Sequence, residues 1–417
     1  MLPSDIGSLK LLQVLDLRGT EINLLPDEIR ELSSLTYFDI CFYGSINRSE
    51  HLKLPQGLIS SGIISRLSTL QSLGIRVCPG DERWDKCVKS IIYEVSKLTG
   101  LTSLSFYFPE VELLELFLQK SAAWIDQCLT EYNFVVGRDI KRIVSRVPQY
   151  VELDYDQTSQ RLRFVNGEKI PDAIVKVLAY CSAFYLDHHL DVISISKFGI
   201  ANMNKLKHCI VSECPTVKAV LDDKEFTEVV FPCLEHLNLH YLWNLEYICN
   251  DLLPEGSFTM LRILYVHACP KLKYVLKSSM LRFFLNLEEL IVDDCTAIEK
   301  IILDDDMTTE LSHMSDSSFK RLTLHYLPAL VTIREGVWPS FEYISVCNCP
   351  NFKKINLDSK SKHTLKGIKG HSLGSFEIPC CTEFPAANQL FTLANKEKGG
   401  NSSPLTTSAI GIANANN

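Results

Sequence analysis

Several side chains that could do chemistry recur at one fixed place in a repeated pattern of this 417-residue chain. Imidazole and carboxylate groups bind metals and act as general acids or bases. If two of these histidines and an aspartate stood in a row, they would form a candidate metal site or the centre of an enzyme. In chain order, the residues at this place are Ser212, His240, His267, Asp293, His325 and Cys347.

The pattern itself is L-x-x-L-x-L, and the reactive residues come directly after it, at the seventh position counted from its first leucine. Ten copies are recognisable, from Leu12-Leu15-Leu17 to the copy that begins at Phe341. The alternating apolar residues predict a short strand with its leucines on one side. A repeat of this length predicts a stack of coils, each burying its apolar face against the next. The expected fold is an α/β leucine-rich-repeat solenoid with a parallel sheet on the concave face and irregular or short helical convex segments.

Five copies carry cysteine at the ninth position. A zinc site typically uses closely spaced C-x-x-C pairs, whereas these cysteines occur once per repeat, 26 or more residues apart. A small thiol at this turn can hydrogen-bond to the backbone of adjacent coils. The spacing therefore predicts a buried structural ladder rather than a metal site, made of Cys78, Cys214, Cys269, Cys295 and Cys349.

The position of the seventh residue favours recognition over catalysis. Adjacent parallel strands lie about 4.8 Å apart, but histidines on a curved concave face splay toward solvent, and the sequence shows no groups that would orient them as ligands. An enzyme built on His240, His267 and Asp293 would bind metal stoichiometrically and lose it in His267→Ala. We expect instead a partner-binding surface, made pH-dependent by its histidines. Its predicted residues are Arg76, Tyr107, Asn238, His240, Tyr241, Tyr265, His267, Asp293, His325 and Tyr326.

Familiar catalytic motifs are absent from the sequence. It contains no phosphate-binding G-x-x-x-x-G-K-[ST] loop, no G-x-G-x-x-G, no H-E-x-x-H and no G-x-S-x-G. The acidic run Asp304-Asp305-Asp306 lacks the spacing of a calcium loop. We therefore expect a protein that is not an enzyme and binds no cofactor or metal.

Composition narrows the partners and the compartment. A net charge of −8, from 42 basic and 50 acidic residues, argues against nucleic-acid binding, which needs clustered positive charge. No apolar stretch reaches the length of about 18 residues that suggests a membrane span. Fifteen cysteines without a recognisable secretory leader predict free thiols in a reducing compartment, the cytoplasm.

The pattern also predicts the domain organisation. Leucine-rich repeats are expected over residues 1–130 and 201–368, with degenerate repeats over 131–200 between them. In this middle part, IPDAIVKVL reads as a helix led by Pro171, with Ile174, Val177 and Leu178 on one side. Residues 369–417 are polar and aperiodic and predict a disordered tail.

Two motifs in the sequence resemble motifs that are typical of one protein family. They are LPxxIxxLxxLxxLDLRGTxIxxLP at the start and C-terminal copies that end in Cys-Pro, such as VSECPTVKAV and VHACPKLKYV. These motifs are similar to the repeat domain of plant intracellular disease-resistance proteins, which combine a coiled coil, a nucleotide-binding module and leucine-rich repeats. The resemblance covers about residues 1 to 368. HTLKGIKG resembles the last step of such domains, but HSLGSFEIPCC follows in place of their usual Trp-rich ending.

The resemblance implies a function as a recognition module of innate immunity. In that family the repeats bind a pathogen effector or a guarded host protein, and they hold the nucleotide-binding module inactive. No motif of that module occurs in this sequence, so we expect this chain to sense but not to signal alone. Two alternatives are a free-standing repeat adaptor and a substrate receptor of a ubiquitin ligase; the latter would need an F-box-like start.

Overall fold

The computed structural model describes most of the repeat region. The described residues are 2–20, 22–42, 57–138, 146–222, 226–249, 253–304, 319–334 and 341–353, together with the backbone of 367–371. From residue 372 on, the predicted disordered tail lies outside the described residues, as do Asp305 and Asp306 of the acidic run.

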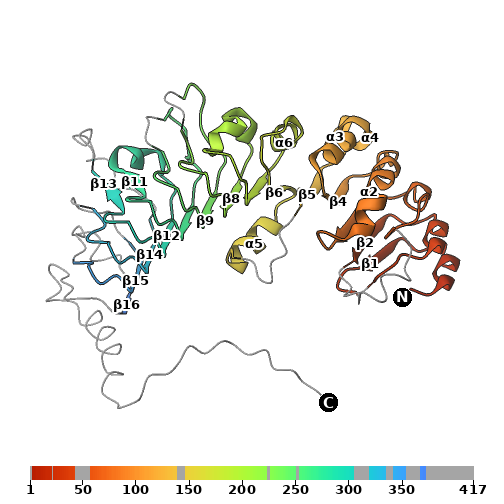
Figure 1. Cartoon of the computed structure of the whole chain (residues 1–417), viewed down its shortest axis with the longest axis horizontal. Helices are drawn as coiled ribbons and strands as arrows, with labels where there is room; N and C mark the ends of the chain where they lie inside the picture. Colours follow the sequence, from red (N-terminus) through yellow and green to blue (C-terminus); the bar gives the residue numbers. More distant parts are fainter. Residues whose placement is uncertain are drawn as a thin grey trace, which may run out of the picture.

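One curved sheet of 14 parallel strands runs through the molecule in chain order, and Figure 1 shows it as the inner side of an arc. This confirms the predicted leucine-rich-repeat solenoid. The strands are β1 (Val14–Leu17), β2 (Tyr37–Phe42), β3 (Ser72–Val77), β4 (Ser103–Phe108), β5 (Glu131–Val136), β6 (Gln160–Val165), β7 (Ala183–Asp187), β8 (His208–Ser212), β9 (His236–His240), β10 (Ile263–His267), β12 (Glu289–Asp293), β14 (Arg321–His325), β15 (Tyr343–Cys347) and β16 (Gly367–His371).

The outer side of the arc carries short helices and one small extra sheet (Figure 1). The α-helices there are α2 (Glu82–Val95), α3 (Val111–Lys120), α4 (Ala122–Ile125) and α6 (Asp172–Leu178). The 3-10 helices are η1 (Ser4–Ser8), η2 (Asp27–Glu31), η3 (Ile64–Arg66), η4 (Ile195–Phe198), η5 (Ile200–Met203) and η6 (Ser278–Phe283), and β11 (Leu276–Lys277) pairs with β13 (Ile302–Leu303). In the described part of the chain, every helix falls short of the length and apolarity needed to cross a bilayer.

The main core lies between the sheet and these outer segments. Apolar residues at positions four and six of each copy join it, as Leu264 and Val266 do in β10. Helix α2 adds a buried face that includes Trp84, whose indole N–H donates to the Tyr107 carbonyl at 3.1 Å. The predicted helix after Pro171 is confirmed as α6, which buries Ile174, Val177 and Leu178.

A left-handed residue follows each strand of the curved sheet from β6 to β15. At position eight φ lies near +53°, for example at Ala268, and the Ala268 N–H donates to the Asp293 carbonyl of the next coil at 2.9 Å. This conformation is costly for residues other than glycine, so the hydrogen bond between coils must stabilise it. The positions concerned are Asn166, His188, Glu213, Tyr241, Ala268, Asp294, Tyr326 and Asn348.

Four of the five ladder cysteines are buried as predicted: Cys214, Cys269, Cys295 and Cys349. The Cys295 thiol donates to the Asp293 carbonyl at 3.3 Å and accepts the Cys269 N–H at 3.4 Å, which links two coils. The side-chain contact with the Cys269 thiol, and then burial, raise the thiol pKa of Cys295, so this residue stays protonated.

The prediction for Cys78 is wrong, because its side chain is exposed. In β3 the alternation continues through Leu73, Ile75 and Val77, all of which are buried. The next residue therefore points away from the core. In the C-terminal copies the left-handed residue at position eight interrupts this alternation and turns the ninth residue inward.

Candidate functional site

A helix of the chain itself lies on the concave face. This is α5 (Gln149–Asp156), which stands apart from the other helices on the inner side of the arc (Figure 1). Its side chains Val151 and Tyr155, with Val147 before it, form a buried cluster with four residues of the sheet, Ala183, Tyr185, Ile210 and Tyr265. No sequence motif predicted that a helix would cover this part of the concave face.

Aromatic contacts fix the two ends of α5. The ring of Tyr150 stacks on Tyr265 of β10, with centroids 6.3 Å apart and planes inclined by 6°. At the other end, Tyr155 meets Tyr185 of β7 edge to face at 5.9 Å. The helix therefore runs across the strands, from β10 back to β7.

Polar contacts border this packing. Asp154 lies 3.7 Å from the His236 ring. Just before the helix, the Arg146 guanidinium lies 3.8 Å from Glu213 and stands over the Tyr241 ring at 5.4 Å. Apolar contacts thus form the centre of the interface, with charged groups around them.

Four predicted partner-binding residues are buried, which corrects the expectation that the concave side chains face solvent. Tyr107, Asn238, His240 and Tyr265 are at most 5% exposed. Tyr265 lies beneath α5, and Asn238 pairs in register between Ile210 and Tyr265, which both contact the α5 cluster. Tyr107 belongs to the main core cluster instead.

His240 is enclosed by its neighbours. Its ring lies 4.8 Å from that of Tyr265, and its Nδ1 is 3.5 Å from Nδ1 of His267. Burial, with a smaller contribution from His267, lowers the pKa of His240 to about 3, so the ring is neutral at physiological pH.

The other predicted contact residues remain at least partly accessible: Arg76, Tyr241, His267, Asp293, His325 and Tyr326. Tyr326, at the end of β14, is 54% exposed. Within the described residues, no three histidine, cysteine or acidic side chains are arranged to hold a metal ion. The row His240, His267 and Asp293 is adjacent in register, but one of its rings is buried.

A hollow of about 350 Å³ lies over β2 to β6, on the side of the turn after α5 that faces the N-terminal strands of the sheet. Asp39, 6% exposed, is at its floor, and Arg76 approaches the carboxylate to 3.3 Å and Arg18 to 3.8 Å. Burial raises the pKa of Asp39, an effect that the two arginines oppose. The register places Gly74 beside Asp39, and a Cβ at Gly74 would come within 2.6 Å of its carboxylate.

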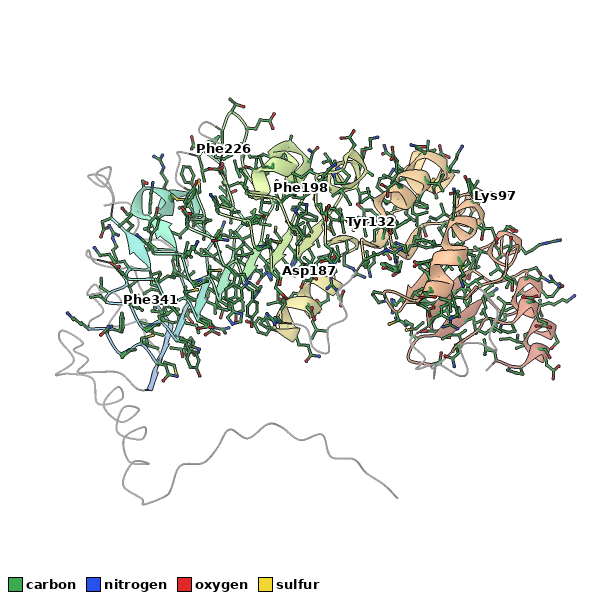
Figure 2. The ribbon with its side chains drawn as sticks, viewed as in Figure 1. Lys97, Tyr132, Asp187, Phe198, Phe226 and Phe341 are labelled. Carbon is green, nitrogen blue, oxygen red and sulfur yellow. The ribbon has the colours of Figure 1, made fainter. Side chains whose placement is uncertain are left out.

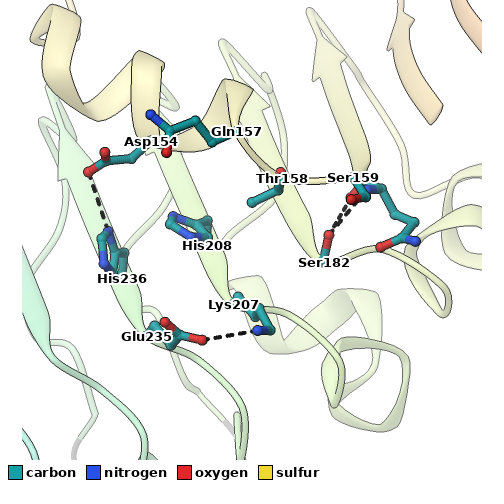
Figure 3. Close-up of a pocket in the computed structure, with 10 residues that line it drawn as sticks. Asp154, Gln157, Thr158, Ser159, Ser182, Lys207, His208, Glu235 and His236 are labelled. Carbon is teal, nitrogen blue, oxygen red and sulfur yellow. Dashed lines mark hydrogen bonds and ion pairs between the residues drawn. The ribbon is translucent and has the colours of Figure 1, made fainter. Parts of the chain in front are cut away.

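A second hollow, of about 490 Å³, opens at the C-terminal end of α5 (Figure 3). His208 and His236 lie in it with ring centroids 4.4 Å apart, and Lys207 pairs with Glu235 at 3.3 Å. Burial, and then the neighbouring His236, lowers the pKa of His208 to about 4. The turn after α5 lines both hollows and thus divides the concave face.

The coils, their shared sheet and the fixed role of each repeat position define a leucine-rich-repeat protein. Residues 234–364 match the family described as plant disease resistance protein RPS2-like, leucine-rich repeats. This match confirms the resemblance to the repeat domain of plant disease-resistance proteins.

Two relatives from Arabidopsis thaliana extend the match. The chain is 25% identical over 390 residues to disease resistance protein At4g27190, an alignment that covers 88% of this chain and 36% of that protein. It is 26% identical over 119 residues to probable disease resistance protein At5g47260, covering 27% and 12% of the two chains. The chain thus spans about a third or less of the length of these relatives.

Two solved structures show a limited likeness to this chain. The leucine-rich-repeat protein LIC12759 of Leptospira interrogans matches with a TM-score of 0.33 and 16% identity, over 87% of this chain and 89% of that one. A TLR13–ssRNA13 complex matches with a TM-score of 0.26 and 13% identity, over 87% and 63% of the two chains.

Proposed function

We propose that this chain is a non-catalytic protein-recognition module of a plant innate-immune receptor and works in the cytoplasm. It binds a pathogen effector or a guarded host protein. In a full-length receptor it also restrains a nucleotide-binding switch. The match to disease-resistance repeats supports the biological setting, and the geometry of the concave face supports the mode of binding.

The observation that carries the proposal is the open stretch of sheet beyond α5. On β12, β14 and β15 the residues at positions three, five and seven are partly or fully exposed, whereas positions four and six are buried. Tyr343 is 45% exposed, and Arg321 lies 3.8 Å from Glu289 on the adjacent strand. An exposed tyrosine beside arginine is a combination enriched at protein interfaces.

Binding to a separately purified nucleotide-binding module of a disease-resistance protein tests the restraint. We expect Arg321→Ala and Tyr343→Ala to weaken this binding about tenfold each, which corresponds to about 1.4 kcal/mol. Lys97→Ala is the matched control, because Lys97 is exposed on the outer side of the arc (Figure 2). Equal losses in all three variants would place the contact elsewhere.

The same variants test recognition of foreign proteins. In leaves that express the full-length receptor with one pathogen effector at a time, an effector that triggers cell death should lose its effect with Arg321→Ala or Tyr343→Ala and keep it with Lys97→Ala. Unchanged responses in both concave variants would contradict recognition through β14 and β15.

A further inference from the structure

We propose that the middle of the concave face is a helix-binding surface, which α5 occupies as a built-in competitor. A partner would reach this surface by replacing α5 with an amphipathic helix that carries apolar and aromatic residues on one face. The inference rests on the proposed function, because it names the kind of partner that the concave face takes.

The footprint of α5 fits the surface beneath it. A helix of eight residues is about 12 Å long. Three steps between neighbouring strands, from β7 to β10, measure about 14 Å. The ends of the contact are marked by two tyrosines of α5: Tyr155 packs on β7, and Tyr150 packs on β10. One short helix therefore spans the surface.

The packing beneath α5 is separate from the main core. Val147, Val151 and Tyr155 form a cluster with side chains on the concave face of the sheet. The leucines of the repeats belong to a different cluster on the other face. Helix α5 can therefore leave the sheet without opening the core that holds the coils together.

Helix α5 depends on the sheet for its own stability. Isolated helices shorter than about 12 residues are marginal in water, and no side chain caps the α5 N-terminus. Its outer face leaves Leu153 52% exposed. Because little besides the sheet contact holds this helix in shape, a longer amphipathic helix would have more to gain from the same surface.

The contacts of α5 describe the partner. Its inward residues Val147, Val151 and Tyr155 follow each other at intervals of four, the spacing of one helix face. A basic residue precedes them, since Arg146 lies beside Glu213, and an acid near the other end meets His236. The partner helix would repeat this order of basic, apolar and acidic groups.

A fluorescent peptide of residues 146–157 tests the proposal against the full chain. Val151→Asp should release α5 and let the chain bind the peptide at least 100-fold more tightly than the wild type does, because a tethered segment competes at millimolar effective concentration. Leu153→Asp is the matched control: it makes the same change on the outer face of α5 and should leave peptide binding at the wild-type level.

Three outcomes would overturn the inference. One is a Val151→Asp chain that loses its cooperative melt, because α5 would then be part of the fold. Another is a folded Val151→Asp chain, and a folded Tyr155→Ala chain beside it, that bind no peptide. The third is wild-type chain that binds the peptide as tightly as Val151→Asp does.

The outcome is separable from that of the proposed function. If the folded release variants bind no peptide while Arg321→Ala still weakens binding of the nucleotide-binding module, the inference fails and the proposed function stands. If the peptide binds Val151→Asp but neither the module nor any effector depends on Arg321 or Tyr343, the proposed function fails at that surface. In that case the helix-binding surface remains, without the receptor role.

Discussion

The buried imidazole of His240 makes the stability of this protein depend on pH. Its pKa is lowered to about 3 in the folded protein, from an ordinary value of 6.5. The unfolded chain therefore binds a proton at this residue between those values, and the folded chain does not. The contribution of the buried, neutral His240 ring to the free energy of unfolding is fully present above pH 6.5 and is lost as pH falls toward 3.

The magnitude at pH 5 follows from the distance to the unfolded-state pKa. That pH lies about 1.5 units below the ordinary histidine value, and each unit corresponds to about 1.4 kcal/mol. The His240 ring should therefore lower the free energy of unfolding by about 2 kcal/mol between pH 7.5 and pH 5. His208, with its pKa lowered to about 4, acts in the same direction, whereas the raised pKa of Asp293 acts against it.

Comparison with His240→Leu isolates the contribution of this residue. In the wild type, Nε2 of His240 is buried without a hydrogen-bond partner. Leucine has a similar volume and carries no such polar atom. Urea denaturation followed by circular dichroism at pH 7.5, 6 and 5 should show a loss of stability that is about 2 kcal/mol smaller in the variant. Equal losses in variant and wild type would refute the burial of this ring.

Three further predictions test the turns and the ladder. Ala268→Val should cost about 1 to 3 kcal/mol because a branched side chain resists positive φ, whereas Ala268→Gly should change stability by less than about 1 kcal/mol; thermal melts of both would show the difference. Gly137→Ala should cost more than about 3 kcal/mol, since φ is +101° and the new methyl would overlap the Val165 carbonyl oxygen; wild-type urea stability would contradict this. Cys295→Ala should cost about 1 to 3 kcal/mol, and the exposed Cys78→Ala less than about 0.5 kcal/mol; equal urea midpoints would refute the difference in burial.

The apolar pattern was sufficient to predict most of the coils, but not the one that contains β5. Leucines at positions four and six identify a strand because only inward side chains must be apolar. The pattern did not predict strand β5, because Tyr132 and Phe134 take the place of leucine there. Both side chains are buried. Aromatic residues fill the same interior space, but a search for leucine does not find them.

The surface was harder to predict, since its exposure depends on segments that are distant in sequence. Helix α5 precedes β6 in the chain but reaches residues on β8 and β10. A local signal did exist: Val147, Val151 and Tyr155 have helical spacing around Pro148. It indicates an amphipathic helix without saying which surface the helix covers.

The turn at position eight, by contrast, had no clear signal in the sequence. Residues as different as Glu213, Tyr241 and Ala268 adopt the same positive φ, because the hydrogen bond to the next coil favours this conformation whatever the side chain. The exposure of Cys78 depends on the same turn, which β3 lacks.

Hydroxyl-radical footprinting of the chain with and without a bound nucleotide-binding module tests the recognition surface most directly. Tyr326 and Tyr343 are 54% and 45% exposed at the concave side, and Tyr93 and Tyr180 match them outside it at 44% and 46%. The proposed function predicts that binding protects Tyr326 and Tyr343 from oxidation and leaves Tyr93 and Tyr180 unchanged. Protection of Tyr93 and Tyr180 alone would contradict it.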